Sequence, residues 1–384
     1  MQRAGIYIHI PFCRSRCSYC DFATGMYEGE LAERYVRALA AEIAAFDPAR
    51  VSHGADAARE VDTIYFGGGT PSLLALRQVE SILGAVREKF RVDPLAEVTM
   101  EMNPGTVTPE LAGQFRRAGV NRASFGLQTF DDEQLRRLGR THTATDARRT
   151  LTILRDAGFT NISFDLIAGL PGQTVEQWSY NLGEALALRP EHLSLYLLEV
   201  HEGTPLADQL RRGFWPQPDP DAAAEMYRVL CERTSAEGYE RYEISNFCLP
   251  GYESRHNLKY WTGAPYYGFG SSAHSFDGRS TRWANERDAA RYCASVETAG
   301  ESVVERTELS DEEAASESLF LGLRLSRGVN LVEHRARFGA DVRARYGEDL
   351  RRFREAGLVE LDGERLRLTR DGALLSNEVF AAFV

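Results

Sequence analysis

The chain has 384 residues, of which 43% are hydrophobic and 26% are charged, and these proportions are ordinary for a globular protein with a sizeable core. Its formal net charge of −11 argues against broad binding to nucleic acids or to anionic membranes. No segment reaches the roughly 18 apolar residues that a membrane span needs, and the N-terminal apolar run is too short for a signal peptide. We therefore expect a cytoplasmic protein, without a nucleic-acid partner and not integral to a membrane, with one large domain and a smaller one.

The first predicted strand, Gly5–Ile10, ends at Pro11 and leads directly into a cysteine loop. Cys13, Cys17 and Cys20 follow in C-x3-C-x2-C spacing. Three thiolates suit a [4Fe–4S] cluster, because each binds one iron and the fourth iron is left without a protein ligand. An iron with an open coordination position is a place for chemistry, so this loop is the first candidate site.

Other uses of these cysteines fit the sequence less well. A closed zinc site would usually include a fourth Cys or His nearby, but Asp21-Phe22-Ala23 follows the third cysteine. A disulfide framework is typical of short secreted chains, which this is not. The scattered Cys231, Cys248 and Cys293 are predicted to be buried, small apolar side chains.

Further β-rich runs follow the first strand, and amphipathic helical patterns separate them. The runs are Val61–Phe66, Val98–Met102, Arg122–Gln128, Ile162–Ile167 and His192–Val200. Repeated strand-helix units predict a parallel sheet, and six of them predict an α/β fold with a partial, TIM-like (β/α)6 barrel. Two helix starts are readable: Thr108-Pro109 puts proline at a first helical position, and Thr174–Gln177 fits a capping box.

Polar residues stand at the ends of these strands, where βα folds bind their ligands. The second strand leads into Gly67–Pro71 (GGGTP), and Glu101, Gln128 and Asp165 lie at or near the ends of the next three. Each alone is also explained as a tight turn or a strand-end cap. Together they predict a polar rim at one end of the barrel.

The barrel pattern is followed by a segment, Gly213–Asp221, whose prolines disfavour a helix, and then by an amphipathic helix through about Gly238. An aromatic stretch that we expect to be irregular comes next, and it contains His256 in the hexapeptide HNLKYW. Imidazole is a common axial ligand of heme iron. On chemistry alone, a packed loop with a hydrogen-bonded histidine explains His256 as well.

From about Ser310 the pattern reads helix, helix, helix and hairpin, which predicts a winged-helix-like α+β region. Residues 330–370 contain ten arginines and eight Asp plus Glu, so the basic surface of a DNA reader is missing. We expect a module that packs on the barrel or covers a substrate. The predicted division is therefore residues 1–212 for the barrel, 213–305 for the linker, helix and aromatic segment, and 306–384 for the C-terminal domain.

Several motifs, in order, resemble those of the radical S-adenosylmethionine (SAM) family. They are YIHIPFC, GGGTP, the strand end E-x-N-P, G-x-Q and DLIAGLPGQ, and they resemble the subgroup of oxygen-independent coproporphyrinogen III dehydrogenases (HemN) and heme chaperones (HemW). The resemblance implies a [4Fe–4S] cluster on Cys13, Cys17 and Cys20 whose open iron chelates SAM. It also implies a SAM shell formed by Tyr7, Tyr19, Gly68, Gly69, Thr70, Glu101, Gln128, Arg140 and Asp165.

Within the subgroup, HNLKYW resembles the H-N-x-x-Y-W marker of the heme chaperones. In the dehydrogenases the cysteine motif is expected to read C-x3-C-x2-C-x-C, whereas Phe22 stands at the position of the fourth cysteine here. The dehydrogenases are also expected to carry a long extension before the first strand. The resemblance implies a heme chaperone that delivers heme to acceptor proteins, with respiratory proteins as candidates, and His256 as the candidate heme ligand. A coproporphyrinogen III dehydrogenase and a radical SAM enzyme of another substrate remain alternatives, and catalytic residues and a homodimeric state stay open.

Overall fold

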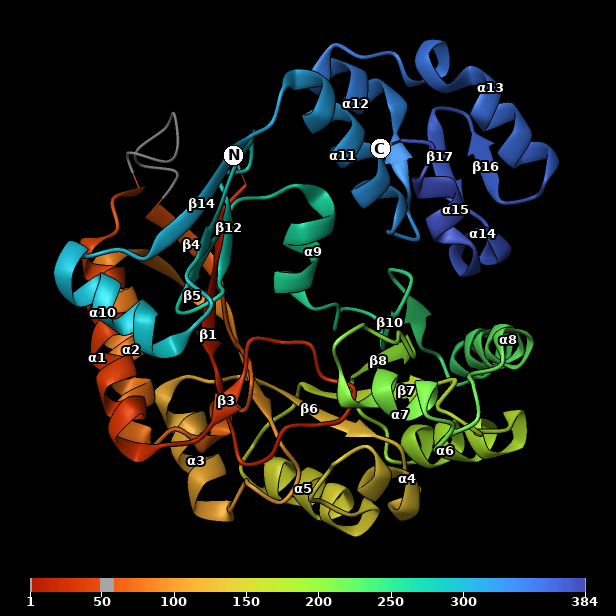
Figure 1. Cartoon of the computed structure of the whole chain (residues 1–384). Coiled ribbons are helices and arrows are strands. Elements are labelled where there is room, and N and C mark those ends of the chain that lie inside the picture. The colour runs from red at the N-terminus through yellow and green to blue at the C-terminus, as the bar shows by residue number, and fades with distance from the viewer. Residues whose placement is uncertain (1, 49–58, 384) are drawn as a thin grey trace.

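The computed structural model of the chain describes residues 2–48 and 59–383, and it is built around a partial barrel (Figure 1). Six parallel strands lie side by side in chain order: β1 (Ala4–Ile10), β4 (Glu60–Gly68), β5 (Arg91–Met102), β6 (Arg122–Gln128), β7 (Ile162–Ala168) and β8 (His192–Leu197). The helices between them are α1 (Gly29–Ala45), α2 (Leu76–Lys89), α3 (Pro109–Ala118), α4 (Asp132–Arg137), α5 (Ala144–Asp156) and α6 (Val175–Ala187). The predicted (β/α)6 barrel is confirmed.

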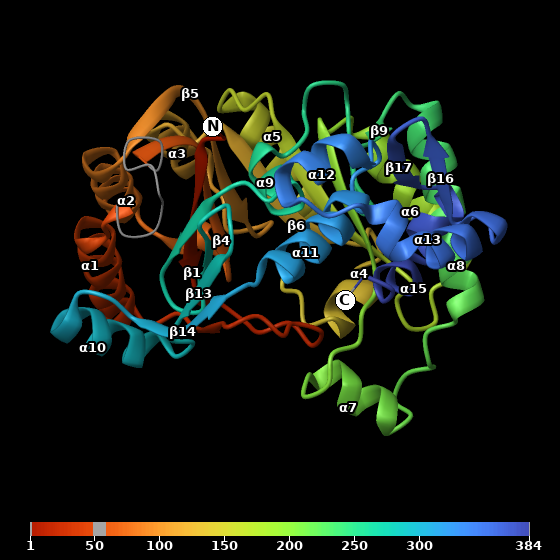
Figure 2. The ribbon, with the colours of Figure 1, turned by 90° about the horizontal axis from the view of Figure 1, so that it is seen from above.

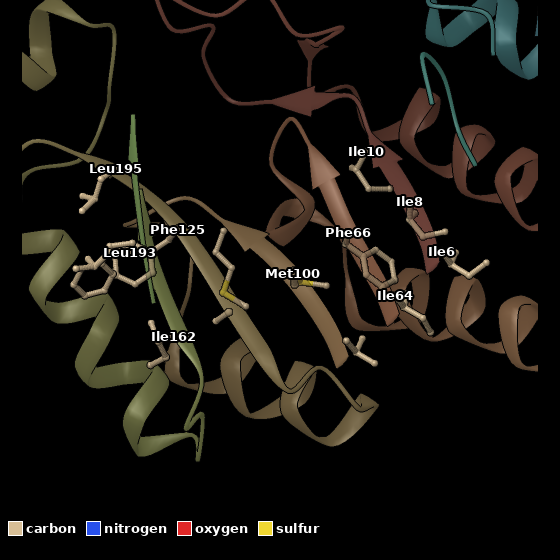
Figure 3. Close-up of a cluster of buried hydrophobic side chains, with 14 of the residues drawn as sticks. Ile6, Ile8, Ile10, Ile64, Phe66, Met100, Phe125, Ile162, Leu193 and Leu195 are labelled. Atoms are coloured by element: carbon tan, nitrogen blue, oxygen red, sulfur yellow. The ribbon is translucent and has the colours of Figure 1, made fainter. Parts of the chain in front are cut away.

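The core lies between the strands and the helices that surround them (Figure 3). In β1, Ile6, Ile8 and Ile10 are fully buried on one face of the strand. The residues between them, Tyr7 and His9, point to the opposite face because side chains alternate along a strand. The apolar alternation of the first strand therefore decides which residues face the barrel interior.

The two predicted helix starts are confirmed by their capping bonds. Thr108 Oγ1 accepts a hydrogen bond from the backbone N–H of Leu111 at 3.2 Å, and proline follows it at the first helical position of α3. Thr174 and Gln177 exchange side-chain-to-backbone bonds at the start of α6, as a capping box requires.

The segment after the barrel contributes more regular structure than the sequence suggests. Strands β11 (Tyr266–Phe269), β12 (His274–Phe276), β13 (Thr281–Asn285) and β14 (Val303–Glu308) extend the sheet beyond β1, and β10 (Asn246–Cys248) and β9 (Glu240–Arg241) extend it beyond β8. Helices α7 (Pro205–Arg211), α8 (Pro220–Ala236) and α10 (Ala289–Ala299) accompany them. Asp219 caps α8, so the helix begins just inside the segment predicted to be non-helical.

The aromatic hexapeptide is helical, which corrects the expectation of an irregular stretch. It lies in α9 (Arg255–Thr262), where Ser254 Oγ accepts from the N–H of Asn257 and Gly263 ends the helix in the left-handed conformation. These are ordinary start and stop residues for a short helix. The aromatic residues of the stretch led us to expect irregular structure, so these two helix-boundary residues were not recognised.

The C-terminal region has the predicted order of elements. Helices α11 (Asp311–Leu323), α12 (Leu331–Phe338) and α13 (Val342–Glu355) precede the hairpin of β16 (Val359–Asp362) and β17 (Arg365–Leu368), which β15 (Val329–Asn330) joins. Two short helices follow, α14 (Arg370–Leu374) and α15 (Ser376–Phe380). Helix α11 packs on α9, and the region lies beside the barrel over its β8 side (Figure 2). Within residues 2–48 and 59–383, no helix is both long and apolar enough to cross a membrane.

Candidate functional site

A pocket of about 590 Å³ lies at the carboxyl ends of the barrel strands. This volume is within the roughly 300–1,000 Å³ that is typical of small-molecule sites. Its walls are the cysteine loop, the strand ends and part of the C-terminal region. The predicted site residues that line it are Cys13, Cys17, Cys20, Tyr19, Gly68, Gly69, Thr70, Glu101, Gln128, Arg140 and Asp165. Tyr7 and His256 are the two predicted residues that do not.

The cysteine loop is held against the barrel rim by backbone and side-chain bonds. The N–H of Ser18 donates to Leu138 O at 2.9 Å. Thr70 Oγ1 donates to Cys13 Sγ at 3.7 Å, and Arg140 Nη1 donates to Cys17 Sγ at 3.5 Å. Hydrogen bonds from Thr70 and Arg140 therefore connect two of the three thiols to the barrel rim.

The three thiols influence one another's ionisation. Burial raises the pKa of the Cys13 thiol, the hydroxyl of Thr70 opposes this, and the nearby Cys17 and Cys20 raise it further. Within the described part of the chain, no three His, Cys, Asp or Glu side chains are close enough together to hold one metal ion. A [4Fe–4S] cluster spreads its thiolates apart, because each binds a different iron.

The backbone N–H groups of the glycine segment at the end of β4 are used within the protein. Gly68 N donates to Glu101 Oε2 at 3.1 Å, Gly69 N to Ile10 O at 2.8 Å, and Thr70 N to Phe12 O at 2.8 Å. A Cβ on Gly69 would lie 2.7 Å from Phe12 O, so glycine is needed here for the close approach of the cysteine loop.

Two half-buried carboxyl groups face the pocket. Glu101 accepts hydrogen bonds from the hydroxyl of Tyr65 at 2.8 Å and from Gly68 N. Burial raises the pKa of Glu101 to about 7, and the neighbouring Asp165 contributes to this. Burial also raises the pKa of Asp165, although Ser194 and Ser124 oppose it with hydrogen bonds. A positively charged or hydroxyl-bearing ligand would lower the free-energy cost of ionising these two groups, because it interacts favourably with the carboxylates.

Arg140 supplies the matching donor for an anionic group. Its Nη2 donates to Asn103 Oδ1 at 2.7 Å and to Gly126 O at 2.5 Å. Its Nε is buried and has no hydrogen-bond partner among the described residues. The residue lines the pocket, and a guanidinium in a pocket wall is a matching partner for a ligand carboxylate. The pocket therefore offers carboxylates and a guanidinium together, which fits the ammonium, sulfonium and carboxylate of SAM.

Two predicted SAM residues are positioned differently from each other. Tyr19 lines the pocket and packs against the apolar pair Leu138 and Leu170. Tyr7 lies below the pocket: its hydroxyl bonds His9 Nδ1 at 3.1 Å, and its ring stacks on Tyr65 with centroids 6.2 Å apart. Tyr7 therefore supports the residue that holds Glu101, and its expected place in the pocket wall is not observed.

His256 is not positioned to bind a ligand in this structure. Its side chain is inside the barrel and only 1% exposed. Nδ1 is 2.8 Å from Thr63 Oγ1 and Nε2 is 3.0 Å from the hydroxyl of Tyr260. Burial lowers the pKa of His256 to about 3, and the positive charges of Lys259 and Arg122 add to this. The neutral ring thus has both nitrogens bonded, which corresponds to the packed histidine of the sequence-based alternative.

The C-terminal region contributes residues that the sequence motifs did not identify. Arg324, Leu374 and Ser376 line the pocket, so this region forms part of its wall. Phe22 lines it as well, and 63% of that residue is exposed. The sequence shows an aromatic residue directly after the cysteine motif, so Phe22 could be found from the sequence. Arg324 belongs to no motif and could not.

Comparisons with known proteins agree on the family of the chain. Residues 7–180 match the model of the radical SAM superfamily, and residues 309–375 match that of the HemN C-terminal domain. A heme chaperone HemW of Lactococcus lactis is 35% identical over 378 residues, which cover 98% of this chain and 96% of that one. A heme chaperone HemW of Mycobacterium tuberculosis is 37% identical over 381 residues, with 98% and 94% covered.

Among solved structures, coproporphyrinogen III oxidase (HemN) from Escherichia coli, a radical SAM enzyme, superposes with a TM-score of 0.85. The match covers 100% of this chain and 90% of that one, at 24% identity. At this identity the similarity bears on the fold alone. It agrees with the α/β barrel and the smaller C-terminal region described above.

Proposed function

Because this chain belongs to the HemW family of the radical SAM superfamily, we propose that it is a heme chaperone that binds heme and delivers it to acceptor proteins. The observation that carries the proposal is identity of 35% or more to HemW heme chaperones over 98% of the chain. The proposal extends to a cytoplasmic location and to acceptors that include respiratory proteins.

The pocket supports a [4Fe–4S] cluster and SAM as resident groups. Cys13, Cys17 and Cys20 would hold the cluster, which supplies an iron able to chelate SAM and an electron to reduce it. Arg140 would donate to the carboxylate of SAM, and Glu101 and Asp165 would accept from its ribose hydroxyls or ammonium.

A coproporphyrinogen III dehydrogenase is the second candidate, and the match of residues 309–375 to the HemN C-terminal domain is the observation that favours it. Phe22 separates the two readings, because it occupies the position at which the dehydrogenases are expected to carry a further cysteine. Its exposed ring in the pocket wall offers apolar contact instead of a thiol. A flat, apolar macrocycle is a suitable partner for such a ring.

Anaerobic reconstitution of the cluster, followed by titration with heme or coproporphyrinogen in the presence of SAM, tests the proposal. We expect a Soret band that saturates at a defined stoichiometry of heme, and no porphyrin product from coproporphyrinogen. The Cys17→Ala variant serves as the control without an intact cluster. Oxidation of coproporphyrinogen with cleavage of SAM would overturn the chaperone reading in favour of the dehydrogenase.

A further inference from the structure

The C-terminal region contributes one cation to the pocket wall, and neither the cluster nor SAM accounts for it. Arg324 follows the last residue of α11 and lines the same pocket as the three cysteines. Helix α11 packs on α9 (Figure 1), and Arg324 contacts Trp261 of α9, so the residue lies where the C-terminal region meets the segment after the barrel. A cation at this junction can contact a ligand that extends beyond the SAM site.

Arg324 is held in place by two groups from the segment after the barrel. Its guanidinium carbon lies 4.2 Å from the centre of the Trp261 ring, and Nη2 lies 3.3 Å from Glu243 Oε2. Glu243 is fully buried, and its other oxygen accepts from Ser245 N and Asn246 Nδ2. The aromatic hexapeptide thus contributes Trp261 as a platform for a pocket residue, while its histidine is used inside the barrel.

This arrangement leaves hydrogen-bond donors of Arg324 unused. A guanidinium has five N–H donors in its plane, and stacking on an aromatic ring uses only its face. Among the described residues, Glu243 is the one side chain that accepts from it, through Nη2, and no described group accepts from Nη1. Nε is buried and is therefore not accessible to a ligand. The side chain remains 26% exposed. A carboxylate is the group that matches a free guanidinium edge in charge and in geometry.

The pocket that Arg324 lines suits an apolar ligand that carries such a carboxylate. Phe22, Tyr196 and Leu374 line the pocket with it, and the first two are 63% and 43% exposed. Exposed aromatic and aliphatic side chains in a pocket are typical of sites for flat apolar ligands. Heme combines an apolar macrocycle with propionate carboxylates at one edge.

We infer that Arg324 binds a heme propionate, and that heme occupies the part of the pocket between the barrel rim and the C-terminal region. This inference rests on the proposed function and assigns the cargo a site away from His256. The carboxylate of SAM is the other anion available, and Arg140 is the donor proposed for it above. Arg324 would therefore bind the propionates of heme and not the carboxylate of SAM.

Heme and heme dimethyl ester, which lacks both propionate charges, provide the test. Loss of one charge-assisted hydrogen bond corresponds to a roughly tenfold or greater loss of affinity. We expect Arg324→Gln to weaken heme binding by about tenfold and to leave ester binding and SAM binding unchanged. Arg324→Lys keeps a charge beside Glu243, so its heme affinity should lie between those of the wild type and of Arg324→Gln. Arg327→Gln is the matched control, because Arg327 is exposed nearby and does not line the pocket.

Each other result has a defined meaning. An equal loss of affinity for heme and its ester would show that Arg324 acts only on the fold, and would overturn the inference. A loss of SAM affinity with heme binding unchanged would assign the carboxylate to SAM instead, and would also overturn it. Wild-type protein that binds neither porphyrin would overturn the proposed function itself.

Discussion

Nδ1 of His256 lies 2.8 Å from the hydroxyl oxygen of Thr63, although 193 residues separate the two in the chain. The bond joins α9 to β4 on the face of the sheet that carries Tyr7 and Tyr65, whose rings lie beside His256. Tyr260, one helical turn further along α9, bonds the other ring nitrogen. The histidine of the hexapeptide therefore connects the segment after the barrel to the barrel itself.

We predict that His256→Ala lowers the free energy of unfolding by about 2–4 kcal/mol, because it leaves two buried hydroxyl groups without a partner and opens a cavity. Chemical denaturation measures this. The control is His274→Ala, since His274 is exposed and surface substitutions usually change stability by less than about 0.5 kcal/mol. Heme spectra of both variants, recorded with the cluster intact, should match the wild type. A shifted Soret band in His256→Ala alone would mean that α9 moves and that His256 ligates heme after all.

A second prediction concerns the cysteines. Cys13, Cys17 and Cys20 line one pocket, whereas Cys231, Cys248 and Cys293 are buried elsewhere in the fold. Single changes to Ala in the first group should remove the absorbance and iron content of the reconstituted cluster. The same changes in the second group should leave both intact. Normal iron content in Cys17→Ala would show that the cluster is not held as proposed.

A third prediction concerns the glycine segment. Gly69→Ala would place a methyl group 2.7 Å from Phe12 O, so the cysteine loop must shift. We expect a loss of about 1–3 kcal/mol in stability and incomplete cluster assembly, as for other overpacked sites. Calorimetric melting and iron content measure the two effects.

Gly84→Ala is the control for this substitution. Gly84 lies inside α2, and a Cβ there would meet nothing within 4 Å. Because alanine favours the helix, this variant should be more stable than the wild type by about 0.5–1 kcal/mol. If Gly69→Ala melted and bound iron like Gly84→Ala, the close approach of the cysteine loop would not constrain this position.

The barrel could be predicted from the sequence because its signals are local. The apolar residues of β1 alternate before Pro11, and the start of α6 carries its capping box within four residues of sequence, from Thr174 to Gln177. Family motifs then located the cysteine loop and most of the pocket. These features depend on neighbours in the chain, which a sequence shows directly.

The remaining features depend on contacts between distant segments. The burial of His256 follows from Thr63 on β4, and the position of Arg324 follows from Trp261 and Glu243. The resemblance implied that Tyr7 belongs to the pocket wall. The alternation of side chains along the strand shows only that Tyr7 faces the barrel interior. Its depth below the pocket depends on the ring of Tyr65, which no local pattern reveals.

The last prediction concerns the pH dependence of SAM binding. Burial and the nearby Asp165 raise the pKa of Glu101 from its ordinary 4.5 to about 7 in the ligand-free protein. Between these two values the folded state holds a proton that the unfolded state has lost, so this group makes the free protein less stable as the pH rises. Binding of a cationic ligand favours the ionised carboxylate and reverses that preference. SAM affinity should therefore increase by up to roughly tenfold between about pH 6 and pH 8, with release of a proton.

Titration calorimetry in two buffers of different ionisation enthalpy measures both the affinity and the number of protons released. Glu101→Gln should bind SAM more weakly and lack the Glu101-dependent part of the pH profile, so identical profiles in the two proteins would show that Glu101 does not contact the ligand.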